Sequence, residues 1–466
     1  MTTKTLQMAF ILMALLTSCG NAKKNAEPQV AKTFTGAKGE VRLLTLDPGH
    51  FHAALVQKKM YDMVNPEVRV YAPEGADLTQ HLNRITGYNT RKESPTSWNE
   101  IVYNSPDYFA KMLEEKAGNV VVLSGNNRIK TEYIKKSVEA GLNVFADKPM
   151  VITPENFPML EESFKIAAEK KVLLFDIMTE RFEITSKLQM ELSHIPGIFG
   201  TLLPGTKEQP GIEIFSVHFF YKSVSGSALV RPGWFFDVDQ QGEGMVDVAT
   251  HLVDLVQWGC FPGVILQKSD IEMLQARRYP TVLTLDEFKA VTKMEAFPEN
   301  LSKYVKDGKL DEYANGEMLY KIKGIHAKVT AEWQYKAPEG SGDTHYAILR
   351  GSKASVEIKQ GVAEKYLPTV YVHANPGTPL PEFSAELENA IVKNAAHAGL
   401  TLEKVGERSW KIGIPAEYKV GHEAHFSQVT EKYLEYLKAG KLPEWEVPNM
   451  IVKYFTTTEA LRMARK

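Results

Sequence analysis

The chain has 466 residues, more than one ordinary domain holds and enough for two or three. Hydrophobic residues make up 44% and charged residues 24%, a balance typical of a globular protein with a substantial core. The formal net charge of −2 argues against a strongly basic surface, so we expect neither nucleic acid nor an anionic membrane surface as a partner.

The N-terminus has the features of an export signal. Lys4 precedes an apolar stretch, Met8–Leu16, which is too short to span a bilayer and has the length of a signal-peptide core. The stretch runs into LTSC at residues 16–19, which resembles the bacterial lipobox. That resemblance implies cleavage before Cys19 and lipidation of this cysteine, so we predict a signal peptide over residues 1–18.

Residues 19–38 are polar and are predicted to form a flexible tether. The expected product is a cell-envelope lipoprotein, facing the periplasm or lying on the cell surface and anchored through Cys19. An ordinary secretory signal with a chance cysteine is the alternative. The only other cysteine is Cys260, so no internal disulfide is expected.

Residues 39–178 alternate between apolar strands and amphipathic helices. Strands that are apolar throughout and separated by helices predict a parallel sheet covered on both faces, which is a Rossmann-like, doubly wound α/β domain. Ligands of such sheets bind at the carboxyl ends of the strands. The predicted strands are Val41–Leu46, Val68–Ala72, Val120–Leu123, Val144–Ala146 and Val172–Asp176.

Residues 179–466 are predicted to form a second, α+β domain with a largely antiparallel open sheet, a surface that could also support a homo-oligomer. Ser269–Gly324 is charged and partly helical, without an interpretable periodicity. The last helices, about residues 421–466, could pack back on the first domain. The predicted strands of this part are Ile212–Tyr221, Ala327–Tyr335, Tyr346–Gly351 and Ala354–Lys359.

The turn after the first strand, TLDPGHFHAAL at residues 45–55, has an unusual composition. It lies where a dinucleotide-binding protein carries a glycine-rich turn, yet Gly49 is its only glycine. Three interpretations compete: a modified phosphate cradle, a metal site built on His50, His52 and Asp47, and a plain strand-to-helix corner. The metal interpretation lacks further ligands at a recognisable spacing, so no metal is predicted.

A predicted helix within GEGMVDVATHLVDLVQW, residues 242–258, places Asp247, His251 and Asp254 on one face. Polar groups on an otherwise apolar helix are costly to bury unless each has a partner or a ligand. They form either a hydrogen-bonded structural triad or a site in which His251 is a general base oriented by Asp247.

Two further segments follow predicted strands and would lie at the edge of the ligand crevice. Lys148, within ADKPM, follows one strand, and SGNN, Ser124–Asn127, follows another. Small and amide side chains there allow close approach of a ribose or a phosphate. Each segment is a weak signal by itself, because a lysine at a strand end is common.

Together these segments resemble the Gfo/Idh/MocA oxidoreductases. The Glu-Lys-Pro of that family looks like Asp147-Lys148-Pro149 here, and its Thr-Pro-Asn looks like Ser124-Gly125-Asn126. Its Asp-x-x-x-His is matched at Asp247 and His251. RPGWF, at residues 231–235, resembles a segment of exported members found in glycan-degrading bacteria.

The resemblance implies NAD(P)-linked oxidation of a hydroxyl of a sugar or polyol. Lys148 would contact the cofactor and the substrate hydroxyl, His251 would take the proton, and Asp247 would hold the substrate or the imidazole. Arg181 could also face the cleft. The candidates for binding the sugar are His218, Lys222, Arg231, Trp234 and Glu180. For each of them the alternative is a purely structural role.

The cofactor turn departs from the family pattern, since its three glycine positions hold Asp47, Gly49 and His52. No arginine lies beside Glu74, the nearest acid to the ribose position, which favours NAD without excluding NADP. Export implies a tightly bound cofactor. The residues expected to bind it are Asp47, Gly49, His50, Phe51, His52, Glu74, Ser124, Gly125, Asn126 and Asp147.

The expected function is a glycoside dehydrogenase, oxidising carbon 3 during glycan breakdown. One alternative is a glycosidase that uses NAD catalytically through a transient keto-sugar. Another is a sugar-binding lipoprotein that kept the fold and lost catalysis.

Overall fold

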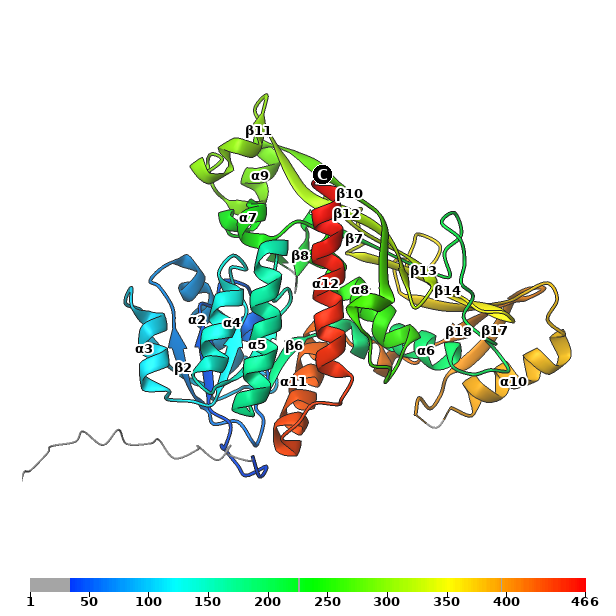
Figure 1. The fold of residues 1–466 in the computed structure, drawn as a ribbon, viewed down its shortest axis with the longest axis horizontal. Helices are drawn as coiled ribbons and strands as arrows, with labels where there is room; N and C mark the ends of the chain where they lie inside the picture. The colour runs from blue at the N-terminus through cyan, green and yellow to red at the C-terminus, as the bar shows by residue number, and fades with distance from the viewer. Residues whose placement is uncertain (1–33, 225–226, 395) are drawn as a thin grey trace, which may run out of the picture. The chain divides into compact units, whose positions relative to one another are not determined.

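The computed structural model describes residues 34–224, 227–394 and 396–466. These residues form one parallel and one mostly antiparallel sheet with surrounding helices (Figure 1), which confirms the α/β class. The predicted signal peptide and Cys19 lie outside the described residues. No helix in the described part of the chain is both long enough and apolar enough to cross a bilayer.

The first sheet has the strand order β3-β2-β1-β4-β5-β6, and all its neighbours run parallel. This is the doubly wound order, with its switch point between β1 and β4. β3 was not predicted. The strands of the first sheet are β1 Leu43–Leu46, β2 Glu67–Tyr71, β3 Asn99–Tyr103, β4 Val120–Leu123, β5 Asn143–Asp147 and β6 Leu174–Ile177. The helices between them are α1 His52–Leu55, α2 Ala76–Thr90, α3 Tyr108–Glu115, α4 Lys130–Glu139 and α5 Phe157–Lys170.

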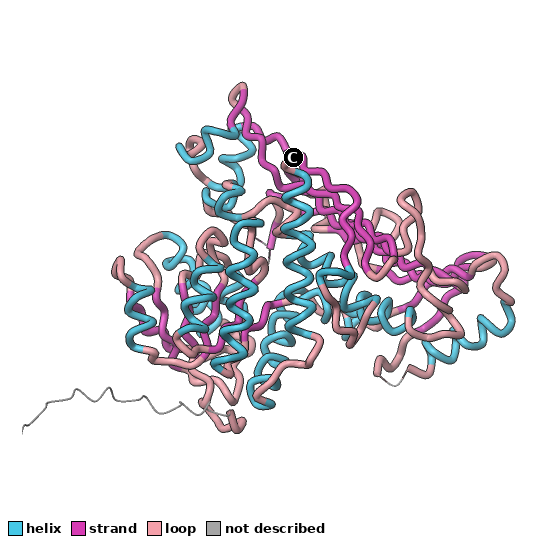
Figure 2. The backbone as a smooth tube through the Cα atoms, in the orientation of Figure 1, coloured by secondary structure: helices cyan, strands magenta, loops and turns pink. Residues whose placement is uncertain are grey.

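The second sheet has the order β10-β12-β13-β7-β14-β15-β16-β18-β17, with β11 beside β12. Its strands follow one another as a continuous band (Figure 2). Among the described strands of this second sheet, only β13 and β7 pair in parallel. The strands are β7 Ile212–Tyr221, β10 Ile271–Thr284, β11 Val305–Lys306, β12 Lys309–Ile322, β13 Ile325–Lys336, β14 Thr344–Arg350, β15 Ala354–Lys359, β16 Thr369–Ala374, β17 Thr401–Gly406 and β18 Ser409–Gly413.

The segment expected to be charged and partly helical, Ser269–Gly324, instead contains β10 and β12. The helix α9 between them accounts for the helical part. A short hairpin, β8 Ser223–Val224 and β9 Ser227–Ala228, follows β7. The remaining helices are α6 Ile184–Ser193, α7 Val238–Gln241, α8 Val248–Cys260, α9 Leu285–Thr292, α10 Leu380–Val392, α11 His422–Ala439 and α12 Glu446–Ala464, with the short 3-10 helices η2 Thr179–Phe182 and η3 Gly233–Phe236 near the site.

The C-terminal helices join the two parts of the fold. α11 contributes Tyr433 to the core of the first sheet, where its ring stacks on Phe145 of β5 with centroids 4.5 Å apart. α12 packs against α5, α8 and β10, and Figure 1 shows it beside α5. Burying these apolar faces against both sheets places the start of α11 near the carboxyl edge of the first sheet.

The first domain begins earlier than the predicted tether allows. The backbone N–H groups of Thr35, Gly36 and Ala37 donate to the carboxylate of Glu40. Phe34 packs against the core of the first sheet. Residues 34–38 are therefore part of the fold.

Candidate active site

The turn after β1 is a tight corner in which Asp47 adopts a positive φ of 48°. The Tyr133 hydroxyl donates to Asp47 Oδ2 at 3.2 Å. Gly125, at the end of β4, packs so closely on the turn that an added side-chain carbon would lie 2.1 Å from the Asp47 carbonyl oxygen. Burial raises the pKa of Asp47 to about 6, although the bond from Tyr133 opposes this shift.

His52 points away from Asp47 and toward Asp147 at the end of β5. His52 Nδ1 lies 2.9 Å from Asp147 Oδ2, and Ser124 Oγ donates to the same oxygen at 2.8 Å. His50 Nδ1 lies 3.8 Å from this oxygen. Burial opposes ionisation of Asp147, but His52, Lys130 and His50 outweigh it, so the pKa of Asp147 is well below its ordinary value. Burial lowers the pKa of His52 to about 4, despite the neighbouring carboxylate.

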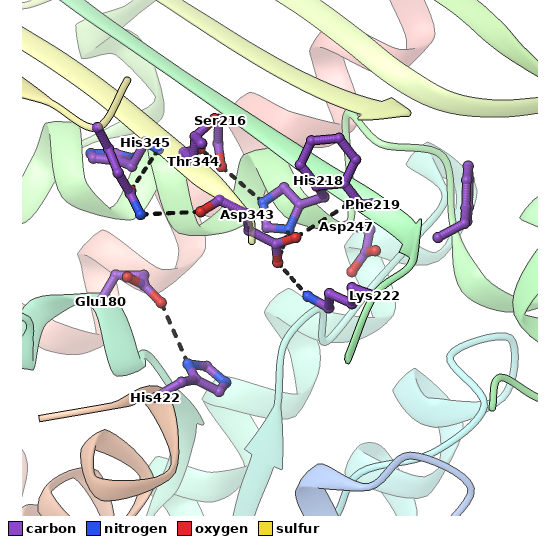
Figure 3. Close-up of polar contacts among 12 residues, drawn as sticks. Glu180, Ser216, His218, Phe219, Lys222, Asp247, Asp343, Thr344, His345 and His422 are labelled. Atoms are coloured by element: carbon purple, nitrogen blue, oxygen red, sulfur yellow. Dashed lines mark hydrogen bonds and ion pairs between the residues drawn. The ribbon is translucent and has the colours of Figure 1, made fainter. Parts of the chain in front are cut away.

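His422, the first residue of α11, extends this group. Its Nε2 lies 3.2 Å from His52 Nε2, and its Nδ1 lies 3.7 Å from Glu180 Oε1 on η2 (Figure 3). Burial would raise the pKa of Glu180, but the hydrogen bond with His422 and the charges of nearby histidines hold it far below its usual range. The predicted pocket residue Glu180 thus belongs to a row of carboxylates and imidazoles.

Lys148 and Asp247 form the centre of the site. Lys148 Nζ donates to Asp247 Oδ1 at 2.6 Å, and Gln241 Nε2 donates to Oδ2 at 3.0 Å. Both oxygens of Asp247 are thus engaged by residues other than His251. Asp247 is the N-cap residue of α8, but its carboxylate makes no capping hydrogen bond and faces Lys148 and Gln241 instead, so these contacts favour its expected role toward the substrate over the one toward the imidazole.

His251 lies one turn into α8. Its Nδ1 is buried and has no hydrogen-bond partner among the described residues. Burial, then the charge of Lys148, lower the pKa of His251 to about 3, while Glu180 raises it. The imidazole is therefore neutral near pH 7 and has a lone pair available for a proton.

Asp254, the third member of the predicted helix face, belongs to a different cluster. It forms an ion pair with Arg181 at 2.6 Å and another with Lys453 at 2.8 Å. Arg181 also pairs with Glu446 at 2.7 Å. Asp254, Lys453 and Glu446 are buried, and Arg181 is largely so, which gives these paired charges a structural role.

His218 on β7 and Lys222, directly after this strand, both point to Asp343 (Figure 3). His218 Nδ1 lies 3.1 Å from Asp343 Oδ2, and Lys222 donates to the same oxygen. Burial would raise the pKa of Asp343, but His218 and Lys222 outweigh it and hold the pKa well below its usual value. The two predicted pocket residues are thus brought together by a carboxylate that the sequence did not single out.

Arg231 and Trp234 have roles other than sugar binding in this structure. Arg231 donates to the carbonyl oxygens of Phe219 and Phe220, and its guanidinium lies over aromatic rings, 4.4 Å from the centroid of Phe235. Trp234 on η3 reaches the first domain, where its Nε1 donates to Asp77 Oδ2 at 2.8 Å.

The remaining predicted cofactor residues surround the switch point. Glu74 is exposed after β2. Asn126 Nδ2 donates to Gln240 Oε1 at 2.7 Å, which links the end of β4 to α7. Phe51 is half-buried, with its ring 4.4 Å from that of His52.

The two ends of the predicted dinucleotide site differ in how well they fit the cofactor. At the nicotinamide end, Ser124 and Lys148 follow neighbouring strands. His251 is close enough to Lys148 that the lysine charge lowers its pKa, and its Nδ1 has no hydrogen-bond partner among the described residues. At the diphosphate end, a side-chain carbon on Gly49 would lie 3.0 Å from Asp77 Oδ2 and 3.2 Å from Trp234 Cζ2. The residues around the switch point fit a dinucleotide, provided that the indole of Trp234 moves away from the turn at Gly49.

Sequence reasoning missed Asp343, His345 and His422. Asp343 directly precedes β14, and a single acid before a strand gives no local signal in the sequence. His345 is on β14 beside this acid (Figure 3), and its Nε2 is buried without a hydrogen-bond partner in the described residues. His422 could have been found, because GHEAHF places two histidines three residues apart at a helix start.

Two family models match the chain. Residues 188–465 match the "Putative oxidoreductase C terminal domain", and residues 77–176 match the "Oxidoreductase family, NAD-binding Rossmann fold". The second match begins after the turn that departs from the glycine pattern. No curated protein matches the chain.

Solved structures include a similar protein. A putative oxidoreductase from Parabacteroides merdae is 54% identical, with a TM-score of 0.91 over 93% of this chain and 99% of that one. A 3-ketoreductase from Actinomadura kijaniata, solved with NADP and TDP-benzene, is 12% identical, with a TM-score of 0.53 over 89% and 95% of the chains. Biliverdin reductase from Synechocystis is 13% identical, with a TM-score of 0.53 over 91% and 99%. The chain belongs to the Gfo/Idh/MocA oxidoreductases, which carry an NAD-binding Rossmann fold, as a member with this C-terminal domain.

Proposed function

We propose that the protein oxidises a hydroxyl-bearing carbon of a sugar or glycoside, with NAD(P) as hydride acceptor. The observation that carries this proposal is the juxtaposition of Lys148, paired with Asp247 at 2.6 Å, and the unpartnered imidazole of His251. An acid–base pair of this kind suits alcohol oxidation, in which a hydroxyl loses a proton as its carbon loses hydride.

Lys148 supplies the positive charge in this mechanism. Its ammonium is held by Asp247, and it stabilises the negative charge that develops on the substrate oxygen. Asp247 is itself fixed by Gln241, so Lys148 is held at a defined position before substrate binds. The bound cofactor supplies the hydride acceptor.

His251 takes the hydroxyl proton. Its Nδ1 is buried and has no hydrogen-bond partner within the described residues, so its lone pair is free to accept. The imidazolium formed is stabilised by Glu180, whose charge already raises the pKa of His251 against the effect of burial. Breaking the O–H bond gives its proton to His251 and leaves the electron pair on the oxygen next to Lys148.

His218 and Lys222, fixed by Asp343, support a polyhydroxylated substrate. Both side chains are half-buried, and both contact Asp343 at the end of β7. Several fixed donors in one cleft match the many oxygens of a sugar. Carbon 3 as the site of oxidation, and NAD in preference to NADP, are parts of the proposal that rest on the family resemblance.

The test begins with mass spectrometry of small molecules released from the purified, denatured protein, which we expect to reveal NAD or NADP. The protein is then incubated with an aryl glucoside. Keto-sugar and reduced cofactor without free aglycone support the dehydrogenase. Aglycone without net reduced cofactor supports a redox-neutral glycosidase, and sugar binding unaffected by His251→Ala, with no nucleotide released, supports a binding protein.

A further inference from the structure

His50, His52 and Asp147 form a compact group of metal-ligating side chains that the proposed mechanism does not use. Their candidate ligand atoms all lie within 4.8 Å of one another. Asp147 Oδ2 is 2.9 Å from His52 Nδ1 and 3.8 Å from His50 Nδ1. Two ligand atoms bound about 2.0–2.2 Å from one ion are roughly 3.0–3.5 Å apart, so small side-chain rotations would place these atoms around a common centre.

The tautomers of uncharged imidazoles along the row are compatible with a cation at this place. If His52 Nδ1 carries a proton for Asp147, the lone pair of its Nε2 faces His422 Nε2, 3.2 Å away. His422 must then donate from Nε2. In a neutral imidazole this leaves the Nδ1 lone pair facing the carboxylate of Glu180 at 3.7 Å.

A cation on His52 Nδ1 removes this conflict. His52 then carries its proton on Nε2 and donates to His422 Nε2, and His422 carries its proton on Nδ1, facing Glu180. Each neutral imidazole in the row then has a donor facing an acceptor. Metal-bound histidines usually donate their other N–H to an outer partner in this way.

We propose that His50, His52 and Asp147 bind a divalent transition-metal ion of the zinc class, with His422 and Glu180 as outer partners. Two imidazoles and one carboxylate suit such an ion, whereas Mg²⁺ and Ca²⁺ prefer oxygen ligands alone. Within residues 34–224, 227–394 and 396–466, no other group of three such side chains is this compact. Three protein ligands leave positions open for water or for a substrate oxygen.

The proposal departs from the sequence-based expectation of no metal. That expectation paired the two histidines with Asp47, the nearest carboxylate in sequence. The structure directs Asp47 to Tyr133 and brings Asp147 to the histidines from a different strand. The proposal goes beyond the proposed function, because metal binding here does not depend on the cofactor or the substrate.

The experiment measures metal binding by the full-length protein. The chain is treated with a chelator, dialysed and titrated with Zn²⁺ by calorimetry. We expect one ion per chain, and His50→Ala or His52→Ala to weaken binding by more than about 100-fold. His422→Phe, which removes an outer partner, should weaken it by about 10–100-fold. His326→Ala is the matched control, because this half-buried histidine lies on β13, where its Nδ1 is 3.2 Å from the Pro204 carbonyl oxygen, and its loss should leave the affinity unchanged.

Titration of the unmodified protein with Co²⁺ covers the possibility that a variant fails to fold. Saturable visible absorption at one equivalent supports the site. Absence of stoichiometric binding, several weak sites, or equal affinity of the His52→Ala and His326→Ala variants would overturn the proposal. Because nucleotide release is measured separately, a protein that binds Zn²⁺ but yields no NAD(P) would refute the proposed function and leave this inference standing.

Discussion

Lys148 and Asp247 are 99 residues apart and meet in a 2.6 Å ion pair that joins the end of β5 to the start of α8. Replacement of Lys148 by Met removes the charge beside the reacting oxygen. We expect kcat/KM to fall by about 10²–10³-fold, the cost of losing one preorganised donor. Steady-state measurement of cofactor reduction checks this.

Lys135→Met is the matched control for Lys148→Met, because the Lys135 ammonium pairs with Glu162 on the surface. This control should keep wild-type activity. Equal activity of the two variants would show that Lys148 takes no part in the reaction.

Buried histidines make the free energy of unfolding depend on pH. Burial is the main cause that lowers the pKa of His52, His345 and His425 to about 4 and that of His251 to about 3. In the unfolded chain, a histidine has a pKa of about 6.5. Below pH 6.5 the unfolded chain therefore binds protons that the folded chain excludes, so stability is full above pH 6.5 and is lost as the pH falls toward 4.

Each of these histidines contributes a loss of up to about 1.4 kcal/mol per pH unit below pH 6.5. Urea unfolding at pH 7 and pH 5 measures the combined slope. His425→Gln should reduce that slope, since it removes one such group. A slope identical to that of the wild-type protein would contradict this assignment.

Trp234→Phe should strengthen binding of the dinucleotide. The variant loses the hydrogen bond from Nε1 to Asp77, which holds the ring over Gly49. A hydrogen bond to a charged group contributes about 1.5–3 kcal/mol, so we expect about 10–100-fold tighter NAD binding when it need not be broken. Calorimetry with NAD checks this, and Trp410→Phe, in the second sheet, is the control. Weaker binding would mean that the indole contacts the cofactor instead of blocking it.

Asp254→Asn should strongly destabilise the fold, because Arg181 and Lys453 would remain buried with one partner fewer. Breaking a buried ion pair from one side costs about 3–5 kcal/mol. Chemical unfolding gives this value directly. Asp239→Asn, which breaks an exposed pair with Lys303, should cost less than about 1 kcal/mol. Similar values for the two variants would argue against the buried network.

Cys19→Ser should abolish incorporation of radioactive palmitate and release the protein from the membrane fraction, as the lipobox resemblance implies. Cys260→Ser is the matched control and should remain labelled, because Cys260 lies in α8 within the fold. Continued labelling of the Cys19→Ser variant would refute the anchor.

The sequence predicts best the strands that are buried on both faces. β1, β4 and β6 are buried along their whole length and are mostly apolar, so their composition identifies them. β10 was missed because it is a half-exposed edge strand interrupted by Pro280. The structure accommodates this proline where the pairing register shifts between Tyr279 and Thr281.

The sequence predicted the site residues that belong to short local motifs, and it missed those that do not. Lys148 and Asp247 were recognised from local patterns. Asp343 lies 121 residues from Lys222, and no local periodicity connects them. Asp254 shares a helix face with His251, yet its partners come from η2 and α12, which spacing along α8 cannot reveal.

The docking of α11 on the first domain has a consequence for the order of folding. His422 approaches His52 across 370 residues, so this row of side chains cannot assemble until the last segment of the chain has been made. A chain that ends before Gly421 could still form the strands of the first sheet, but it would lack His422 and the Tyr433 ring that stacks on Phe145. The contact between His52 and His422 is therefore made only after synthesis is nearly finished, whereas Lys148 and Asp247 are already present in a much shorter chain.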